Sequence, residues 1–163
     1  MTKKEYIEII GFNCFDEKEC LEAVKENGWA LEYVKEQTDE ICMAAVTQDP
    51  YALQFVKKQT PEICLEAVKE NGLALDYVKE QTEEICLEAV KQDGLALQYI
   101  KEQTPEICLE AVKQDAWALQ FVKEQTPEIC LEAVKRDLGA VRCVNSGLVH
   151  SILEDCPNGK NEK

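Results

Sequence analysis

Pairs of glutamates one helical turn apart are the residues in this sequence whose spacing could support chemistry. Two carboxylates at this separation can exchange protons with a substrate or bind a hard cation. The pairs recur every 22 residues, as Glu62 and Glu66, Glu84 and Glu88, Glu106 and Glu110, and Glu128 and Glu132. A lysine follows each pair three residues later, which is typical of a solvated helix face. We therefore expect an exposed acidic ladder at these positions and no catalytic site.

Cysteine and histidine could supply nucleophiles or metal ligands. Six of the nine cysteines share the 22-residue period: Cys20, Cys42, Cys64, Cys86, Cys108 and Cys130. Equivalent positions on packed helices are about 8–10 Å apart, whereas a disulfide needs Cα atoms within roughly 7 Å, so we expect a row of reduced, buried thiols. The spacing of His150 from Cys143 and Cys156 matches no zinc pattern. The sequence thus predicts no catalytic residue, no metal site and no cofactor.

The net charge limits the partners that the chain can bind. With 32 acidic against 18 basic residues, the formal net charge is −14, which argues against direct binding to nucleic acid or to an anionic membrane. We expect a protein partner with a neutral or basic surface. No apolar run approaches the roughly 18 residues of a membrane-spanning helix, and Glu5 comes too early for a signal peptide. We therefore expect a cytoplasmic protein.

A tandem repeat supplies the elements that position these side chains. Residues 60–81 and 104–125 agree at 16 of 22 positions. Copies of the unit occupy residues 16–37, 38–59, 60–81, 82–103, 104–125 and, in divergent form, 126–147. Because a unit of this length cannot bury both of its faces alone, we expect its stability to come from stacking on neighbouring copies.

Each unit carries signals for two helices. A threonine such as Thr60 is a good N-cap, and the proline that follows it suits the first helical turn. A second capping residue lies halfway along each unit, in the column Asn27, Asp49, Asn71, Asp93, Asp115 and Asp137. We expect the first helix to bury residues such as Ile63, Cys64 and Leu65, and a second helix of similar length to follow. A continuous coiled coil is excluded, because prolines and Asn-Gly or Asp-Gly pairs interrupt the pattern.

These signals predict an all-α fold, an α-solenoid of about six 22-residue helix-turn-helix repeats with capping helices. The ends depart from the consensus, as expected of caps. We expect an N-terminal capping helix at residues 1–15, a C-terminal capping helix at residues 148–156 and a disordered tail at residues 157–163.

One stretch of the chain resembles a known family. Residues 74–90 read ALDYVKEQTEEICLEAV, which matches the signature Ala-Leu-x-Tyr-Val-x-x-Gln-Thr-x-Glu-x-Cys-Leu-x-Ala-Val throughout. This signature belongs to short α-hairpin tandem repeats of bacterial and large-virus proteins, described as a domain of unknown function. The resemblance covers residues 16–136. It implies the fold but no chemistry, because the family has no established activity.

Positions at which the repeats differ are candidates for recognition, because framework positions must be the same in every copy. The residue that opens the second helix varies, in the column Trp29, Tyr51, Leu73, Leu95 and Trp117. One turn later lie Glu32, Gln54, Asp76, Gln98 and Gln120. We call these two columns the variable stripe, and expect it to bind a partner, since tryptophan and tyrosine are common at interface hot spots. The alternative is that the tryptophans only fill space between hairpins.

The sequence favours a binding protein over an enzyme. We expect a non-enzymatic module that engages a protein partner through an extended surface and sequesters or inhibits it. A first alternative is an acidic nucleic-acid mimic that blocks a DNA- or RNA-binding protein, although residues 104–125 have a net charge of only −2, against roughly six charges on the same length of duplex DNA. A second alternative is a small-ligand sponge, which requires a closed pocket near Trp29 or Trp117. The oligomeric state is left open.

Overall fold

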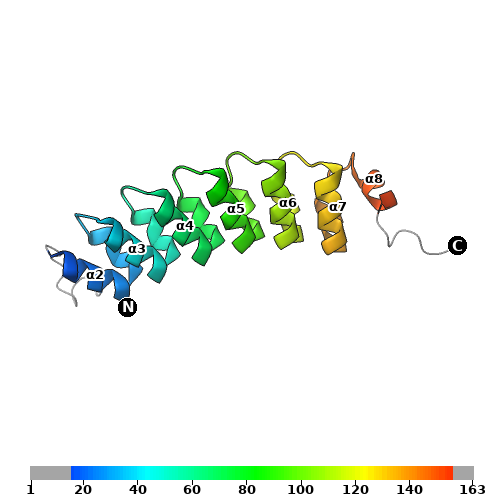
Figure 1. The fold of residues 1–163 in the computed structure, drawn as a ribbon. Helices are drawn as coiled ribbons and strands as arrows, with labels where there is room; N and C mark the ends of the chain where they lie inside the picture. The colour runs from blue at the N-terminus through cyan, green and yellow to red at the C-terminus, as the bar shows by residue number, and fades with distance from the viewer. Residues whose placement is uncertain (1–15, 156–163) are drawn as a thin grey trace. The chain divides into compact units, whose positions relative to one another are not determined.

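The computed structural model describes residues 16–155, and its fold is an all-α repeat (Figure 1). No strand occurs within these residues. In each repeat an α-helix of ten residues alternates with a 3-10 helix of six, so the predicted fold class is confirmed. The chain divides within helix α4 into two units, residues 1–67 and 68–163. The capping helix predicted at residues 1–15 and the tail predicted at residues 157–163 lie outside the described residues.

The first unit contains two described repeats and the start of a third. The first repeat comprises α2 (Glu17–Glu26) and the 3-10 helix η1 (Gly28–Tyr33). The second comprises α3 (Asp39–Gln48) and η2 (Pro50–Phe55), and α4 (Pro61–Glu70) begins the third. α2 packs against α3, and η1 packs against η2. Like elements of consecutive repeats therefore lie side by side.

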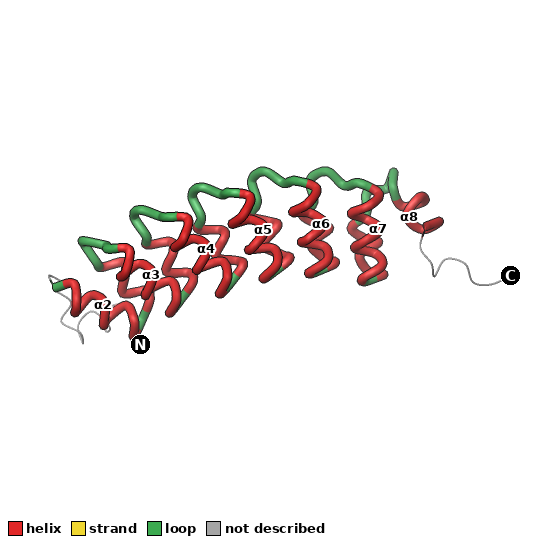
Figure 2. The backbone as a smooth tube through the Cα atoms, in the orientation of Figure 1, coloured by secondary structure: helices red, strands yellow, loops and turns green. Residues whose placement is uncertain are grey.

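The second unit continues this pattern and adds a final helix. Its elements are η3 (Gly72–Tyr77), α5 (Glu83–Gln92), η4 (Gly94–Tyr99), α6 (Pro105–Gln114), η5 (Ala116–Phe121), α7 (Pro127–Arg136), η6 (Leu138–Cys143) and α8 (Val149–Asp155). The helices α5, α6 and α7 pack in sequence, and the 3-10 helices η3 to η6 do the same. The connections that follow the 3-10 helices run along one edge of this row (Figure 2).

Threonine and Asx side chains begin the helices at the predicted positions. Oγ1 of Thr104 accepts a hydrogen bond from the backbone N–H of Ile107 at 3.3 Å. The other α-helices of this series are capped in the same way by Thr38, Thr60, Thr82 and Thr126. At the midpoint of the repeat, Oδ1 of Asp93 accepts from the N–H of Leu95 at 2.9 Å and so begins η4.

The second element of each repeat is a short 3-10 helix and not the longer α-helix that the sequence predicts. In η4 the N–H of Ala96 donates to the carbonyl of Asp93, three residues earlier. The helix ends because Ile100 adopts an extended conformation, with φ −78° and ψ 120°, and buries its side chain. The N–H of Ile100 still donates to the carbonyl of Leu97 at 3.1 Å. The same carbonyl accepts a second, longer hydrogen bond from Gln103 Nε2 at 3.4 Å. A half-unit of eleven residues suits either helix type, so periodicity alone could not distinguish them.

The same residue types are buried in the repeats from α3 to η5, whereas α2 buries no isoleucine and η6 buries only an alanine. In α5 they are Ile85, Cys86, Ala89 and Val90, which form one stripe of the helix. Their counterparts in the 3-10 helices are an alanine and a leucine, such as Ala96 and Leu97. Leu65 and its counterparts are only half-buried, so their predicted place in the core is wrong. The reason is helical geometry, because a residue two positions after the first buried isoleucine points away from the buried stripe.

A glutamine at the end of four repeats joins that repeat to the next, an arrangement that we call the glutamine bridge. Gln103 Nε2 donates to the carbonyl of Leu97 in its own repeat and, at 2.9 Å, to that of Phe121 in the next. Its Oε1 accepts from the backbone N–H of Lys123 at 3.0 Å and from Sγ of Cys108 at 3.6 Å. Bridges to the following repeat are also made by Gln37, Gln81 and Gln125.

The column of bridging glutamines ends after Gln125. The next position of the column is Gly147, which has no side chain to make a bridge. The regular series of repeats therefore stops with α7 and η6. Helix α8 packs on α7 and lies within the residues for which the sequence predicts a C-terminal capping helix; its role as a cap stays a prediction.

Candidate protein-binding surface

Two tryptophans are exposed on the 3-10 helices. Trp29 in η1 is 43% exposed, and Trp117 in η5 is 40% exposed. The other members of their column, Tyr51, Leu73 and Leu95, are half-buried. The 3-10 helices pack side by side within a unit. In the first unit the structure therefore places η1, which carries Trp29, next to η2, which carries Tyr51. In the second unit it aligns the elements of Leu73, Leu95 and Trp117.

Both tryptophans also bond to the following repeat. Trp117 Nε1 donates to Oδ2 of Asp137 at 3.1 Å, and Trp29 Nε1 donates to Oδ2 of Asp49 at 2.5 Å. The ring of Trp29 further makes an edge contact with Phe55, with centroids 5.5 Å apart and an interplanar angle of 66°. Packing between hairpins therefore covers only part of each indole ring. Each indole is held in one orientation, while more than a third of it stays accessible.

The second column of the variable stripe is exposed in every repeat: Glu32, Gln54, Asp76, Gln98 and Gln120. The amide Nε2 of Gln120 donates to the carbonyl of Trp117 at 3.0 Å. Gln54 and Gln98 make the same bond within their own 3-10 helices. Within the described structure the side-chain oxygen of each of these amides has no partner. The edge of the stripe therefore offers fixed hydrogen-bond acceptors.

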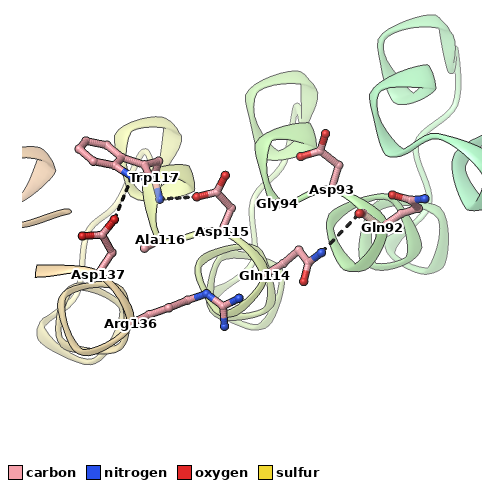
Figure 3. Close-up of a pocket in the computed structure, with 9 residues that line it drawn as sticks. All are labelled: Gln92, Asp93, Gly94, Gln114, Asp115, Ala116, Trp117, Arg136 and Asp137. Carbon is pink, nitrogen blue, oxygen red and sulfur yellow. Dashed lines mark hydrogen bonds between the residues drawn. The ribbon is translucent and has the colours of Figure 1, made fainter. Parts of the chain in front are cut away.

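An open hollow with a volume of about 520 Å³ lies beside Trp117 in the second unit (Figure 3). Its walls include the capping carboxylates Asp93, Asp115 and Asp137 and the side chain of Arg136. The remaining wall comes from the C-terminal ends of α5 and α6 and from the first residues of η4 and η5. A small-ligand sponge requires a closed pocket, and this hollow does not favour that alternative because it is open to solvent.

The acidic ladder lies on the α-helices and is separate from the variable stripe on the 3-10 helices. Its first members, Glu62, Glu84, Glu106 and Glu128, are exposed, and its second members, Glu66, Glu88, Glu110 and Glu132, are half-buried. The lysine that follows each pair, such as Lys91 after Glu88, is exposed on the same helix. Cations therefore accompany the acids on this surface, which reduces its likeness to a row of phosphates.

A half-buried row on the α-helices is a feature that sequence reasoning missed. It consists of Leu21, Met43, Leu65, Leu87, Leu109 and Leu131. In the first unit Leu21 and Met43 line a shallow apolar hollow together with Ala44. The position of this row, directly after the buried cysteine of each helix, was the available signal. It gives the repeat a second surface with apolar character.

Five members of the predicted cysteine row are free and buried: Cys42, Cys64, Cys86, Cys108 and Cys130. Cys20 forms a disulfide, so the prediction of a fully reduced row is wrong at this residue. The distance argument compared members of the row with one another, and Cys20 pairs outside the row. Burial raises the pKa of the Cys42 thiol to about 11, with a further increase from the nearby charge of Asp39. Burial also raises the thiol pKa of Cys86, Cys108 and Cys130.

The remaining candidates for chemistry do not converge. His150 is exposed in α8, and Cys143 is half-buried and free; Cys156 lies outside the described residues. Among residues 16–155 no group of three or more His, Cys, Asp or Glu side chains is arranged to hold a metal ion. Likewise, none of the described helices combines the length and the apolar character needed to cross a membrane.

Comparison with protein families identifies the repeat. A family model described as a domain of unknown function (DUF4116) matches residues 16–60, 39–82, 60–104 and 82–126. Each match spans two repeats, and the matches advance by about one repeat at a time. The chain belongs to the DUF4116 family. The resemblance predicted from residues 74–90 is thereby confirmed. No curated protein and no solved structure matches the chain.

The DUF4116 matches contain the whole variable stripe, from Trp29 to Gln120, and end before Arg136 and Asp137. The repeats of this DUF4116 chain share most of their caps, core residues and terminal glutamines, while the stripe varies among the copies.

The raised thiol pKa values predict that stability falls at alkaline pH. The pKa of Cys42 is higher in the folded than in the unfolded chain, so its contribution is fully present below about pH 9 and is lost as the pH rises through about 11. We expect this thiol to account for a loss of about 2 kcal/mol across that range. Denaturant unfolding at a series of pH values measures the decline, and Cys42→Ala should make it shallower. An identical decline in the variant would contradict the prediction.

Proposed function

We propose that this DUF4116 chain is a non-enzymatic binding protein that engages a protein partner through the variable stripe. The proposal is supported above all by the exposure of Trp29 and Trp117, at 43% and 40%. Tryptophan is among the residues most enriched at interface hot spots, so an indole that stays accessible on the folded surface is a candidate anchor for a partner.

The way in which the indoles are held supports the same proposal. Their N–H groups are fixed to Asp49 and Asp137 of the following repeats. A side chain that is already ordered loses little conformational entropy when a partner binds, so more of its contact energy becomes affinity. The caps and glutamine bridges of the frame restrict the backbone beneath the stripe in the same manner.

The partner in this proposal has a neutral or basic surface, because the net charge of the chain is −14 and like charges repel across an interface. Nucleic acid and membrane are not part of the proposal as direct partners. A module of this kind acts by occupying its partner, so we propose that it sequesters or inhibits that protein in the cytoplasm.

Replacing Trp117 by leucine tests the proposal with little risk to the fold, because Leu73 and Leu95 occupy the same column. We expect the affinity for a partner recovered from native extract with the wild-type chain to fall by about 30-fold, the equivalent of a hot spot of about 2 kcal/mol. Isothermal titration calorimetry with the purified partner measures the change, and Trp29→Leu extends the test to the first unit.

The matched control is the double variant Glu84→Gln and Glu106→Gln on the acidic ladder. It removes charge from the α-helices without altering the stripe, and we expect the affinity to stay within about twofold. If both tryptophan variants bind the partner as tightly as the wild type, the proposal is wrong. If only the ladder variant loses affinity, the result favours the alternative function, an acidic nucleic-acid mimic.

A further inference from the structure

The N-caps of the 3-10 helices carry more charge than capping requires. Asn71 Oδ1 accepts from the N–H of Leu73 at 2.9 Å, and Asp93 Oδ1 accepts from the N–H of Leu95 at the same distance. An amide thus caps as well as a carboxylate in this frame, in agreement with the similar preference of both residues for N-caps. The negative charge and the second oxygen of an aspartate at this position are therefore available for another role.

That role is visible at Asp137, whose Oδ2 accepts from the indole Nε1 of Trp117 in the preceding repeat. One repeat earlier the residue equivalent to Trp117 is Leu95, which has no side-chain donor. Within residues 16–155, Oδ2 of Asp115 accordingly has no hydrogen-bond partner. Oδ2 of Asp93 likewise has no hydrogen-bond partner within these residues, because the residue equivalent to Trp117 in the preceding repeat is Leu73. The second unit therefore has one such acceptor that is occupied by an indole and two that are open.

The open acceptors border the hollow beside Trp117 (Figure 3). Three carboxylates and the guanidinium of Arg136 line this hollow, which gives a local net charge of −2. Figure 3 shows the Arg136 side chain extending from α7 toward α6. A ligand that takes the place of the indole must present N–H donors from a flat group and should be cationic. The guanidinium of arginine meets these requirements, because it is planar, has five N–H donors and stacks on aromatic rings.

We propose that the variable stripe of the second unit binds an arginine-rich segment of the partner. Guanidinium groups donate to the open Oδ2 atoms of Asp93 and Asp115, and one of them stacks on the exposed part of Trp117. This inference rests on the proposed function and names the chemistry of the partner at the same surface.

Binding of labelled synthetic peptides, followed by fluorescence anisotropy at physiological ionic strength, tests the inference. The probes alternate glycine with arginine, lysine or glutamate. The decisive variant is Asp93→Asn with Asp115→Asn, which preserves both caps because Asn27 and Asn71 already cap two 3-10 helices. Its matched control is Glu84→Gln with Glu106→Gln, which removes the same charge from exposed positions on α5 and α6.

We expect the arginine peptide to bind more tightly than the lysine peptide and the glutamate peptide not to bind. The double asparagine variant should lose about tenfold in affinity and the glutamine control about twofold or less. Equal losses in the two variants would mean that only overall charge attracts the peptide, and would overturn the inference. Equal affinity for lysine and arginine, or no binding of either, would overturn it as well.

Failure of this inference can be told apart from failure of the proposed function. If the arginine peptide does not bind while Trp117→Leu still weakens the natural partner, the binding function stands and the partner's contact segment has another chemistry. If Trp117→Leu and Trp29→Leu leave partner binding unchanged, the proposed function itself is wrong.

Discussion

Replacing Gln103 by alanine should lower the free energy of unfolding by about 3 kcal/mol. The side chain donates to the carbonyls of Leu97 and Phe121 and accepts from the N–H of Lys123. Truncation removes the Gln103 partner of the Phe121 carbonyl and of the Lys123 N–H, and each such group costs about 1–3 kcal/mol when it is buried. The carbonyl of Leu97 loses a second bond but keeps the one from the N–H of Ile100. Water that enters the partly buried site recovers some of this loss. Urea unfolding followed by circular dichroism measures the change.

Gln114→Ala is the matched control for this prediction. Gln114 lies exposed at the end of α6 and makes one long hydrogen bond, 3.5 Å to the carbonyl of Gln92, so we expect a loss below about 0.5 kcal/mol. Gln103→Glu separates the halves of the bridge, because it keeps an acceptor for Lys123 but cannot donate to the two carbonyls. If Gln103→Ala were as stable as Gln114→Ala, the glutamine bridge would contribute nothing to stacking.

Gly94→Leu should destabilise the second unit by about 3 kcal/mol. A Cβ atom at Gly94 would lie 2.5 Å from the carbonyl oxygen of Ala111 and 3.0 Å from Cβ of Asp115, both in the next repeat. A backbone carbonyl cannot rotate away as a flexible side chain can, so η4 and α6 must separate. Thermal and urea unfolding of the purified variant measure the loss.

Ala116 and Leu138 occupy the same position as Gly94 in the next two repeats, and they supply the controls. Ala116 occupies the equivalent position in η5 and is buried, so this column accepts a methyl group where the next repeat is placed to suit it. Gly94→Ala adds the same Cβ atom as Gly94→Leu but no further atoms, so it should cost less, about 2 kcal/mol. Leu138 is the last member of the column and is 59% exposed, as expected where the regular series stops. Leu138→Gly should therefore cost no more than about 1 kcal/mol. Wild-type stability of Gly94→Leu would mean that consecutive repeats are not in close contact.

The repeat fold could be predicted because its determinants are local and present in every copy. Thr104 and Asp93 are capping residues that can be recognised from their own position and that of the following helix. The glutamine bridge could not be predicted in the same way, because the partners of Gln103 belong to two repeats and are backbone groups, which leave no signal in the sequence. The 3-10 type of the second helix was missed for another reason, because a half-unit of eleven residues suits either helix type.

The candidate site was only partly predictable. Variation among copies identified the column of Trp117, but a large apolar side chain serves equally well in packing and in binding. The structure distinguishes packing from binding at Trp117. One edge of the ring is bonded to Asp137, while 40% of the residue stays exposed. The bond joins residues 20 positions apart, a spacing that has meaning only once the stacking of repeats is known. For the same reason the open acceptor of Asp115 could not be inferred from the sequence.

Hydrogen–deuterium exchange of the chain, alone and bound to the partner recovered with it, tests the central claim that the 3-10 helices carry the binding surface. We expect the partner to slow exchange of the backbone amides in η4 and η5 and to leave the exposed first turns of α5 and α6 unchanged. The Trp117→Leu variant should show weaker protection at the same partner concentration. Protection confined to the α-helices that carry the acidic ladder, with none on the 3-10 helices, would contradict the account.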